Sequence, residues 1–206
     1  PIAFDALTVV IHPENTWAEE MTVEQLRKIW EPSAQGVVTR WNQVDPSWPD
    51  EPLKLFGAGS DSGTFDYFTE AVMGKAKSSR GDYTASEDDN VLVTGVSQDR
   101  NAIGYFGFAY YQENANRVKA VRIKTTADAP AVGPAQESVL NATYQPLSRP
   151  VFIYVNAKAV DRPEVRNGRD PVNLDVELRT AAFLSRTPDG YYRFSHRSFL
   201  EFFLAR

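Results

Sequence analysis

The sequence predicts an α/β fold, because short apolar strand patterns alternate with helical patterns along most of the chain. Residues 7–11 form an uninterrupted apolar and β-branched run, which is typical of a strand buried on both faces of a parallel sheet. Thr22 and Gln25 have the spacing of a capping box at the start of a helix, and Pro32 is expected to end that helix. A second clean strand is expected at residues 151–155, so two strands bracket the α/β block.

A short strand, a glycine-rich loop and a helix are expected in succession after a long proline-containing loop. The strand covers residues 53–56 and the loop covers residues 57–62. Phe65 and Phe68 recur at helical spacing in the helix, which should end near Gly74.

Strand and helix patterns then continue to residue 123. A polar segment opens a helix near Asn90, where the acidic run at residues 87–89 is expected to cap it. Val91, Leu92 and Val96 are its expected buried side. The remaining predicted elements are a strand at 103–106, a short helix at 109–113, a strand at 118–123 and a loop at 125–149.

Composition limits the classes of function. The 206 residues include 22 Lys and Arg against 27 Asp and Glu, a net charge of −5, so a nucleic-acid partner is not expected. There is no cysteine, which excludes disulfides, thiolate zinc sites and cysteine nucleophiles. The acidic run lacks the spacing of a calcium loop, so neither a metal nor another cofactor is expected. The chain opens without a signal-peptide pattern.

The segment GAGSDSGTFDYF, at residues 57–68, holds the candidate site. It follows a strand and opens a helix, whose N-terminal N–H groups attract anions. Gly63 allows close backbone approach, while Ser62 and Thr64 can donate hydroxyl hydrogen bonds to the oxygens of a tetrahedral anion. The same residue types are ordinary helix caps, so spacing alone leaves capping as an alternative. No lysine follows in the pattern of a nucleotide P-loop.

Four motifs in a fixed order resemble the phosphate-binding proteins of phosphate ABC transporters, in the periplasmic-binding-protein superfamily. They are DSGTFDYF at 61–68, KSSRGDY at 77–83, SEDDNVLVTGV at 86–96 and NAIGYFGFAYY at 101–111. The resemblance covers residues 1 to about 165. It implies one lobe of a two-lobed fold at residues 1–160, with a mixed, mostly parallel sheet, flanking helices and crossover strands. The first lobe is expected to precede Pro1.

The resemblance also implies the site and the partners. Ser62, Gly63 and Thr64 would hold inorganic phosphate, and the complete protein would dock on a membrane permease at the periplasmic or outer cell surface. Many members carry an arginine where this chain has Ala58. Arg80 is the nearest candidate to supply that charge, with a solvated surface arginine as the alternative. Asp61 is expected to cap the helix or orient the loop. The resemblance implies no enzymatic activity.

The end of the chain has a different character. Residues 161–173 are charged and contain Gly and Pro, as expected of a junction. Residues 174–206, which include DGYYRFSHRSFLEFF, resemble a segment of NACHT-type STAND NTPases and are expected to form a short helical tail of foreign type. The alternative function is therefore an anion-sensing or interaction module fused to STAND-type signalling machinery.

Overall fold

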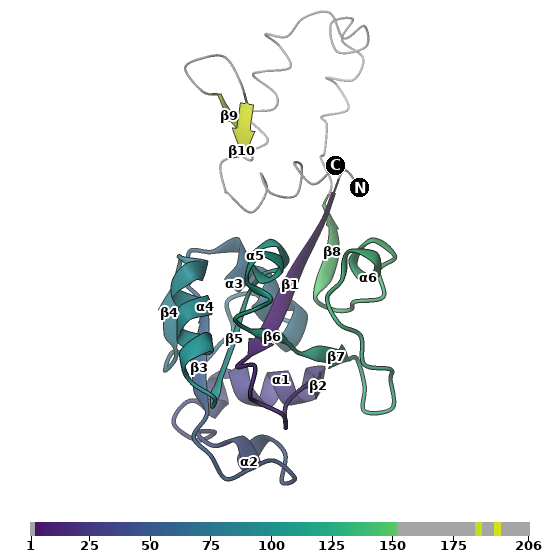
Figure 1. Ribbon diagram of the computed structural model, residues 1–206. Helices are drawn as coiled ribbons and strands as arrows, with labels where there is room; N and C mark the ends of the chain where they lie inside the picture. The colour runs from purple at the N-terminus through teal and green to yellow at the C-terminus, as the bar shows by residue number, and fades with distance from the viewer. Residues whose placement is uncertain (1–2, 152–183, 187–191, 195–206) are drawn as a thin grey trace, which may run out of the picture. The chain divides into compact units, whose positions relative to one another are not determined.

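The computed structural model describes residues 3–151, 184–186 and 192–194 (Figure 1). The chain divides into two compact units, one of residues 5–149 and one that joins residues 1–4 to residues 150–206. Residues 5–149 hold the predicted α/β layer and the candidate site.

A mixed six-stranded sheet organises this layer, in the order β4-β3-β5-β1-β6, with β8 also pairing with β1. The strands are β1 (Ala3–Ile11), β3 (Lys54–Ala58), β4 (Thr84–Ser86), β5 (Ala102–Gly107), β6 (Lys119–Ala120) and β8 (Ser148–Val151). β3 runs parallel to β4 and β5, whereas β1 runs antiparallel to β5 and β6. The expectation of a parallel strand at residues 7–11 was therefore wrong. Burial on both faces was right, since Leu7 and Val10 are both buried, and such burial gives an apolar run in either direction.

Helices and a small second sheet surround these strands (Figure 1). The helices are α1 (Val23–Trp30), the 3-10 helix η1 (Pro32–Ala34), α2 (Trp41–Val44), α3 (Gly63–Met73), α4 (Asp89–Gln98), α5 (Phe108–Asn114) and α6 (Gln136–Leu140). The second sheet pairs β2 (Glu20–Thr22) in parallel with β7 (Arg122–Lys124).

The first helix follows its local sequence signals. Thr22 Oγ1 accepts a hydrogen bond from the Gln25 backbone N–H at 3.0 Å, and Gln25 Oε1 accepts one from the Thr22 N–H at 2.9 Å. The helix ends at Trp30, and Pro32 begins the short 3-10 turn instead of continuing it. The predicted capping box and the predicted stop are both confirmed.

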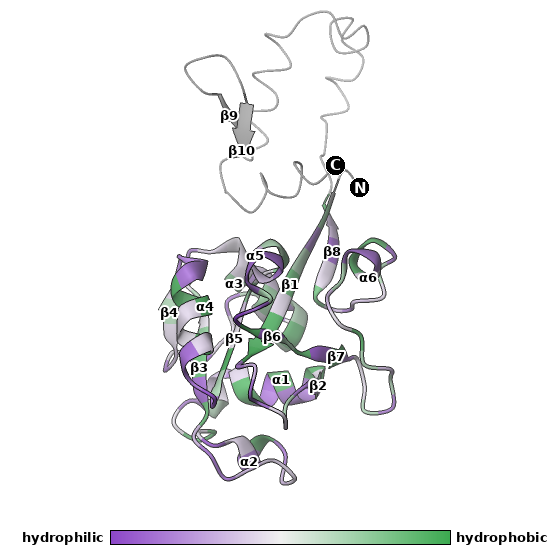
Figure 2. Ribbon diagram, in the orientation of Figure 1, coloured by the Kyte–Doolittle hydropathy of each residue, from purple (hydrophilic) through white to green (hydrophobic). Residues whose placement is uncertain are grey.

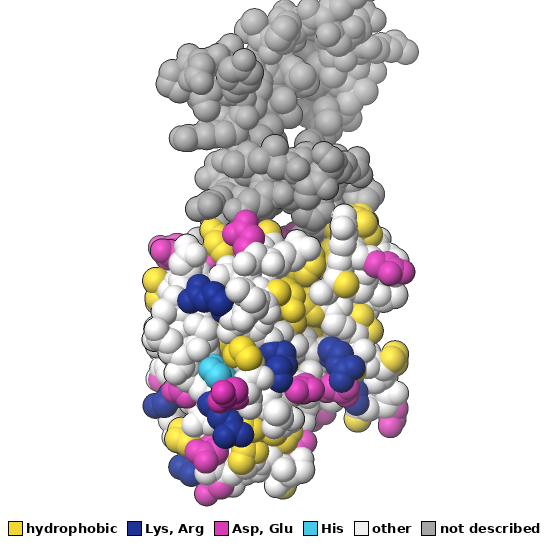
Figure 3. Space-filling view, viewed as in Figure 1, with side chains coloured by type: hydrophobic (Ala, Val, Ile, Leu, Met, Phe, Trp, Pro, Cys, Tyr) yellow, Lys and Arg dark blue, Asp and Glu magenta, His cyan; other side chains and the backbone are white. Residues whose placement is uncertain are grey.

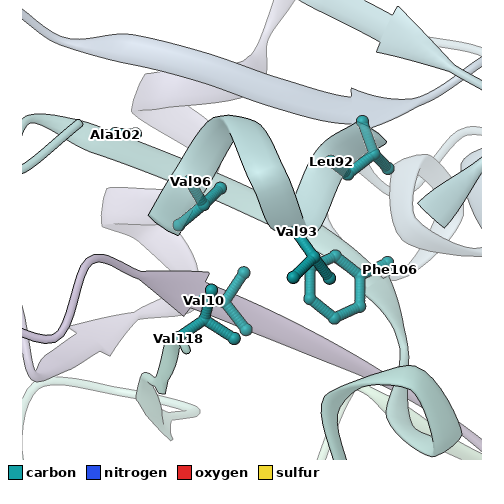
Figure 4. Packing of buried hydrophobic residues seen from close by; sticks show 7 residues of the cluster. All are labelled: Val10, Leu92, Val93, Val96, Ala102, Phe106 and Val118. Carbon is teal, nitrogen blue, oxygen red and sulfur yellow. The ribbon is translucent and has the colours of Figure 1, made fainter. Parts of the chain in front are cut away.

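Helix α4 packs the main apolar cluster against the sheet. Figure 4 shows Val93 of α4 beside Phe106 of β5, in a cluster that also includes Leu92, Val96 and Val10 of β1. Figure 2 shows the hydrophobic residues of β1 where the strand passes through the fold.

One residue of the predicted α4 face was misplaced. Val91 is 47% exposed, whereas Val93 is buried. The helix begins at Asp89, and this phase turns position 91 toward solvent.

Several short elements escaped prediction. The strand expected at 118–123 is two strands, β6 and β7, which pair with different partners on either side of Val121. The segment 125–149, expected to be a loop, contains α6 and the start of β8. Strands of three residues such as β2 and β4 carry too few residues to show a period.

The unit that contains residues 150–206 is described only in part. Leu184–Arg186 (β9) and Tyr192–Phe194 (β10) pair as antiparallel strands, so these residues are not helical as the tail prediction required. The predicted junction at 161–173 and the other tail residues lie outside the described part of the chain.

Candidate functional site

The loop between β3 and α3 ends in a closed turn around Ser62. Ser62 Oγ accepts a hydrogen bond from the Thr64 backbone N–H at 3.1 Å, and the Ser62 N–H donates to the Gly59 carbonyl at 3.1 Å. Ser62 is 8% exposed, whereas Gly63 is exposed at the first position of α3. Ser62 is therefore the N-cap of the helix, and the expectation that Asp61 caps it was wrong, because Asp61 lies one residue too early.

Helix α3 is fixed by an aromatic cluster behind the loop. The Phe68 ring stacks on Tyr105 of β5 with centroids 3.7 Å apart and planes 9° apart, and Trp30 meets both rings edge-on. All three rings are buried. The helix ends at Gly74, whose φ of 75° is a left-handed conformation that glycine adopts readily. The predicted stripe and stop of this helix are confirmed, and they hold its N-terminus in place.

A tyrosine hydroxyl secures the end of β3. Tyr83 Oη donates a hydrogen bond to the Ala58 carbonyl at 3.0 Å. Burial raises the pKa of Tyr83, so this hydroxyl keeps its proton and remains a donor. A Cβ atom at Gly57 would lie 2.7 Å from Cε1 of Tyr105, so only glycine fits beside that ring. The loop thus leaves the strand from a fixed point.

Two hydrogen bonds join this loop to the end of β4. The Gly59 N–H donates to the Ser86 carbonyl at 3.1 Å, and the Asp61 N–H donates to Glu87 Oε1 at 3.3 Å. Glu87 was expected to help cap α4, but the capping side chain is that of Asp88, whose Oδ1 accepts from the Asn90 N–H at 2.9 Å. Sequence reasoning missed the contact of Glu87 because it depends on the pairing of β3 with β4.

Arg80 is held away from solvent by its own partners. Its guanidinium donates two hydrogen bonds to the Asp82 carboxylate, at 2.5 and 2.8 Å, and others to the carbonyls of Ile29 at 3.0 Å and Val38 at 2.9 Å. The side chain is 3% exposed, so the alternative of a solvated surface arginine was wrong. The Arg80 hydrogen bond lowers the pKa of Asp82 to about 2. Every side-chain hydrogen bond that the structure gives Arg80 ends on Asp82, Ile29 or Val38, so it brings Arg80 to none of Ser62, Gly63 and Thr64.

The start of α3 is open to a ligand. Gly63 is exposed, and a Cβ atom built on it would find no atom within 4 Å, so the side-chain position at the start of the helix is unoccupied. The Ser62 hydroxyl uses a lone pair toward Thr64 and keeps its O–H as a donor. With the partial positive charge of the helix N-terminus, these groups can hold the oxygens of a small anion.

Other binding chemistries find less support in the described residues. No group of three or more His, Cys, Asp or Glu within residues 3–151 is arranged to hold a metal ion. The face seen in Figure 3 mixes acidic and basic side chains, whereas nucleic-acid binding needs a clustered basic surface. None of the helices in the described part of the chain is long and apolar enough to cross a membrane.

Comparison with known proteins identifies the family. Residues 1–167 match the model of the PBP superfamily domain. The chain belongs to this family. The protein SphX of Synechocystis sp. is 54% identical to this chain over 167 residues, which cover 81% of this chain and 49% of the relative. The phosphate-binding protein PstS of Staphylococcus saprophyticus is 35% identical over 159 residues, which cover 76% of this chain and 46% of the relative.

Solved structures of the family support the same fold. The crystal structure of a possible phosphate binding protein from Planctomyces limnophilus matches with a TM-score of 0.76 and 45% identity, over 97% of this chain and 68% of that chain. A structure from Clostridium perfringens with bound phosphate matches with a TM-score of 0.58 and 27% identity, over 81% of this chain and 61% of that chain. The chain spans about half the length of the curated relatives that it matches.

Proposed function

We propose that this chain is the phosphate-binding lobe of the substrate-binding component of an ABC-type phosphate uptake system. The observation that carries the proposal is the first turn of α3, where the exposed residue Gly63 follows the capping hydroxyl of Ser62. The PBP superfamily domain supplies the context, and relatives named as phosphate-binding proteins supply the ligand class.

In the proposed complex, three neighbouring residues donate hydrogen bonds to phosphate oxygens. Gly63 and Thr64 provide backbone N–H groups, and Ser62 and Thr64 provide hydroxyl groups. Thr64 is half-buried and Gly63 is exposed, so an anion can approach along the helix axis. Arg80 and Asp61 take no direct part, because Arg80 is bound to Asp82 and the Asp61 carboxylate would repel an anion.

The wider proposal concerns the complete protein. It binds phosphate without chemical conversion and so is not an enzyme, in keeping with relatives that are named as binding proteins. It would work at the periplasmic or outer cell surface, and it would deliver phosphate to a membrane permease. No cofactor and no nucleic acid take part in this proposal.

Titration of the 206-residue chain with inorganic phosphate tests the site by NMR. We expect the backbone amide signals of Ser62, Gly63 and Thr64 to shift in a saturable way as phosphate is added. The amide of Gly74, at the opposite end of α3, serves as an internal reference and should move little. If the three signals stay in place at millimolar phosphate while the protein is folded, the proposed function is wrong.

A further inference from the structure

An open pocket of about 640 Å³ lies beside the first residues of β3, and Leu53, Lys54 and Leu55 are among the residues that line it. We propose that this pocket binds the C-terminal residue of a peptide chain through its backbone N–H and its carboxylate. The inference goes beyond the proposed function, because the loop that carries Ser62 leaves the opposite end of β3, after Ala58.

Two backbone groups at the start of β3 face the pocket without a partner. The Leu53 N–H donates to the Thr39 carbonyl at 2.8 Å, and the pairing with β4 begins where Phe56 lies opposite Thr84. The Leu53 carbonyl and the Leu55 N–H lie on the same edge, between these two contacts, because alternate residues of a strand direct their backbone groups to the same side. In the part of the chain that the structure describes, neither group has a hydrogen-bond partner, although Leu55 is only 7% exposed.

The neighbouring segments explain why both groups are unpaired. The Thr39 N–H, which is next to the carbonyl that accepts from Leu53, donates to Gln43 Oε1 at 2.8 Å. β4 begins at Thr84, so no residue of β4 stands opposite Leu55. Buried backbone groups without a partner are rare in folded proteins, and a ligand that offers both a donor and an acceptor would satisfy the two.

The spacing of the two groups selects one residue of a peptide and its C-terminus. A residue that lies parallel to Lys54 can donate its N–H to the Leu53 carbonyl and accept from the Leu55 N–H, as in a parallel strand pair. Thr84 occupies the next position along this edge, so a chain that runs parallel to β3 must end after that residue. The group that accepts from Leu55 is then a terminal carboxylate.

The charges around the pocket favour a carboxylate. Arg80 is bound to Asp82, and Arg40 is bound to Asp50. Lys54 is exposed and has no ion pair or side-chain hydrogen bond within the described residues, so its ammonium group is available to pair with the carboxylate. A free amino acid would bring a second ammonium group close to Lys54, so an acylated residue is the better ligand.

NMR titration of the 206-residue chain with N-acetyl-leucine, which mimics a peptide C-terminus, tests the inference. We expect the Leu55 amide signal to shift in a saturable way, whereas inorganic phosphate should leave it in place. N-acetyl-leucine amide, which lacks the charge, should bind about tenfold more weakly, the scale of one charge-assisted hydrogen bond. N-acetyl-N-methyl-leucine, which lacks the N–H, should also bind more weakly.

Three results of this titration would overturn the inference. They are an unmoved Leu55 signal at millimolar N-acetyl-leucine, equal binding of the acid and the amide, and tighter binding of free leucine than of N-acetyl-leucine.

Lys54→Gln is the matching change in the protein. We expect it to weaken the binding of N-acetyl-leucine about tenfold and to leave the affinity for the amide nearly unchanged, because only the acid carries a charge. Lys75→Gln is the control, since Lys75 is also exposed but is not one of the residues that line the pocket. An equal loss in both variants would trace the effect to the general charge of the protein and overturn the inference. Both variants should bind phosphate as the wild type does, so a failure of this inference can be told apart from a failure of the proposed function.

Discussion

Ser62 Oγ lies 3.1 Å from the backbone nitrogen of Thr64 and accepts its hydrogen bond, so one side chain both caps α3 and faces the proposed anion. Ser62→Ala removes both roles. We expect a loss of about 1 kcal/mol in the free energy of unfolding from the missing cap, together with a clear loss of phosphate affinity. Urea denaturation and calorimetric titration measure the two effects separately.

Thr22→Ala is the matched control for the cap. Thr22 caps α1 with its hydroxyl group in the same way, but it lies outside the loop. This variant should show the same loss of stability with unchanged phosphate affinity. An equal loss of affinity in both variants would mean that the cap, and not the hydroxyl at the ligand, explains the result for Ser62→Ala.

Gly63→Ala should lower phosphate affinity without lowering the stability of the protein. The added methyl group meets nothing within 4 Å in the protein, and alanine is a better helix former by up to about 1 kcal/mol, so stability should stay the same or rise. The methyl group would stand beside the N–H that is proposed to bind the anion, and we expect phosphate affinity to fall because the ligand is crowded there. Gly107→Ala, at the start of α5, also adds a methyl group in open space and should leave affinity unchanged.

Local signals in the sequence were sufficient to predict the start and the end of α1, the helix that precedes the site. The Thr22 and Gln25 pair and the proline at position 32 fix α1, because a capping box and a helix stop depend only on residues within one turn. Gly74 ends α3 for the same kind of reason. The strand, loop and helix that carry the candidate site were therefore predictable in order.

Contacts between distant segments were not predictable. Arg80 bonds to the carbonyl of Ile29, 51 positions earlier in the chain, and Asp61 bonds to Glu87, 26 positions later. No spacing rule connects such pairs, because strand pairing and helix packing bring them together. For this reason the sequence indicated Arg80 as a source of charge for the anion site or a solvated arginine, and Glu87 as a cap, whereas the structure gives both residues other partners.

The ionised Asp82 carboxylate should stabilise the folded protein, and this contribution should be lost in acid. Its pKa of about 2 in the folded protein lies below its ordinary value of 3.8, chiefly because Arg80 donates hydrogen bonds to it. The contribution is fully present above about pH 4 and is lost as the pH falls toward 2. Asp82→Asn should weaken this acid dependence. It should also lower stability at neutral pH by about 2 kcal/mol, because the Arg80 guanidinium stays buried but loses the negative charge that it is paired with.

Urea denaturation at a series of pH values checks this expectation for Asp82. Asp50→Asn is the control, because Asp50 pairs with Arg40 on the surface, where both side chains are well exposed. Exposed pairs contribute at most about 1 kcal/mol, so this variant should retain most of the wild-type stability and its acid profile. Parallel acid profiles for wild type and Asp82→Asn would contradict the prediction.

Two buried tyrosines should make the protein sensitive to alkali. Burial raises the pKa of Tyr67 and of Tyr144 above the ordinary value of 10, so above about pH 10 the unfolded chain releases protons that the folded chain retains. Stability therefore falls as the pH rises through that range. Replacing either tyrosine by phenylalanine should make this loss of stability smaller. The thermal unfolding temperature, measured at a series of pH values above about 9, checks this.

The two replacements should differ at neutral pH. Tyr67 Oη donates to the Pro146 carbonyl at 2.9 Å, whereas Tyr144 Oη has no hydrogen-bond partner among the described residues. Tyr67→Phe leaves that carbonyl without its donor and should lower stability by about 1 kcal/mol, while Tyr144→Phe removes a hydroxyl that is buried without compensation and should leave stability unchanged or raise it. A greater loss in Tyr144→Phe than in Tyr67→Phe would show that this assignment of hydrogen bonds is wrong. Both variants should bind phosphate as the wild type does, because neither hydroxyl is among the proposed phosphate-binding groups of Ser62, Gly63 and Thr64.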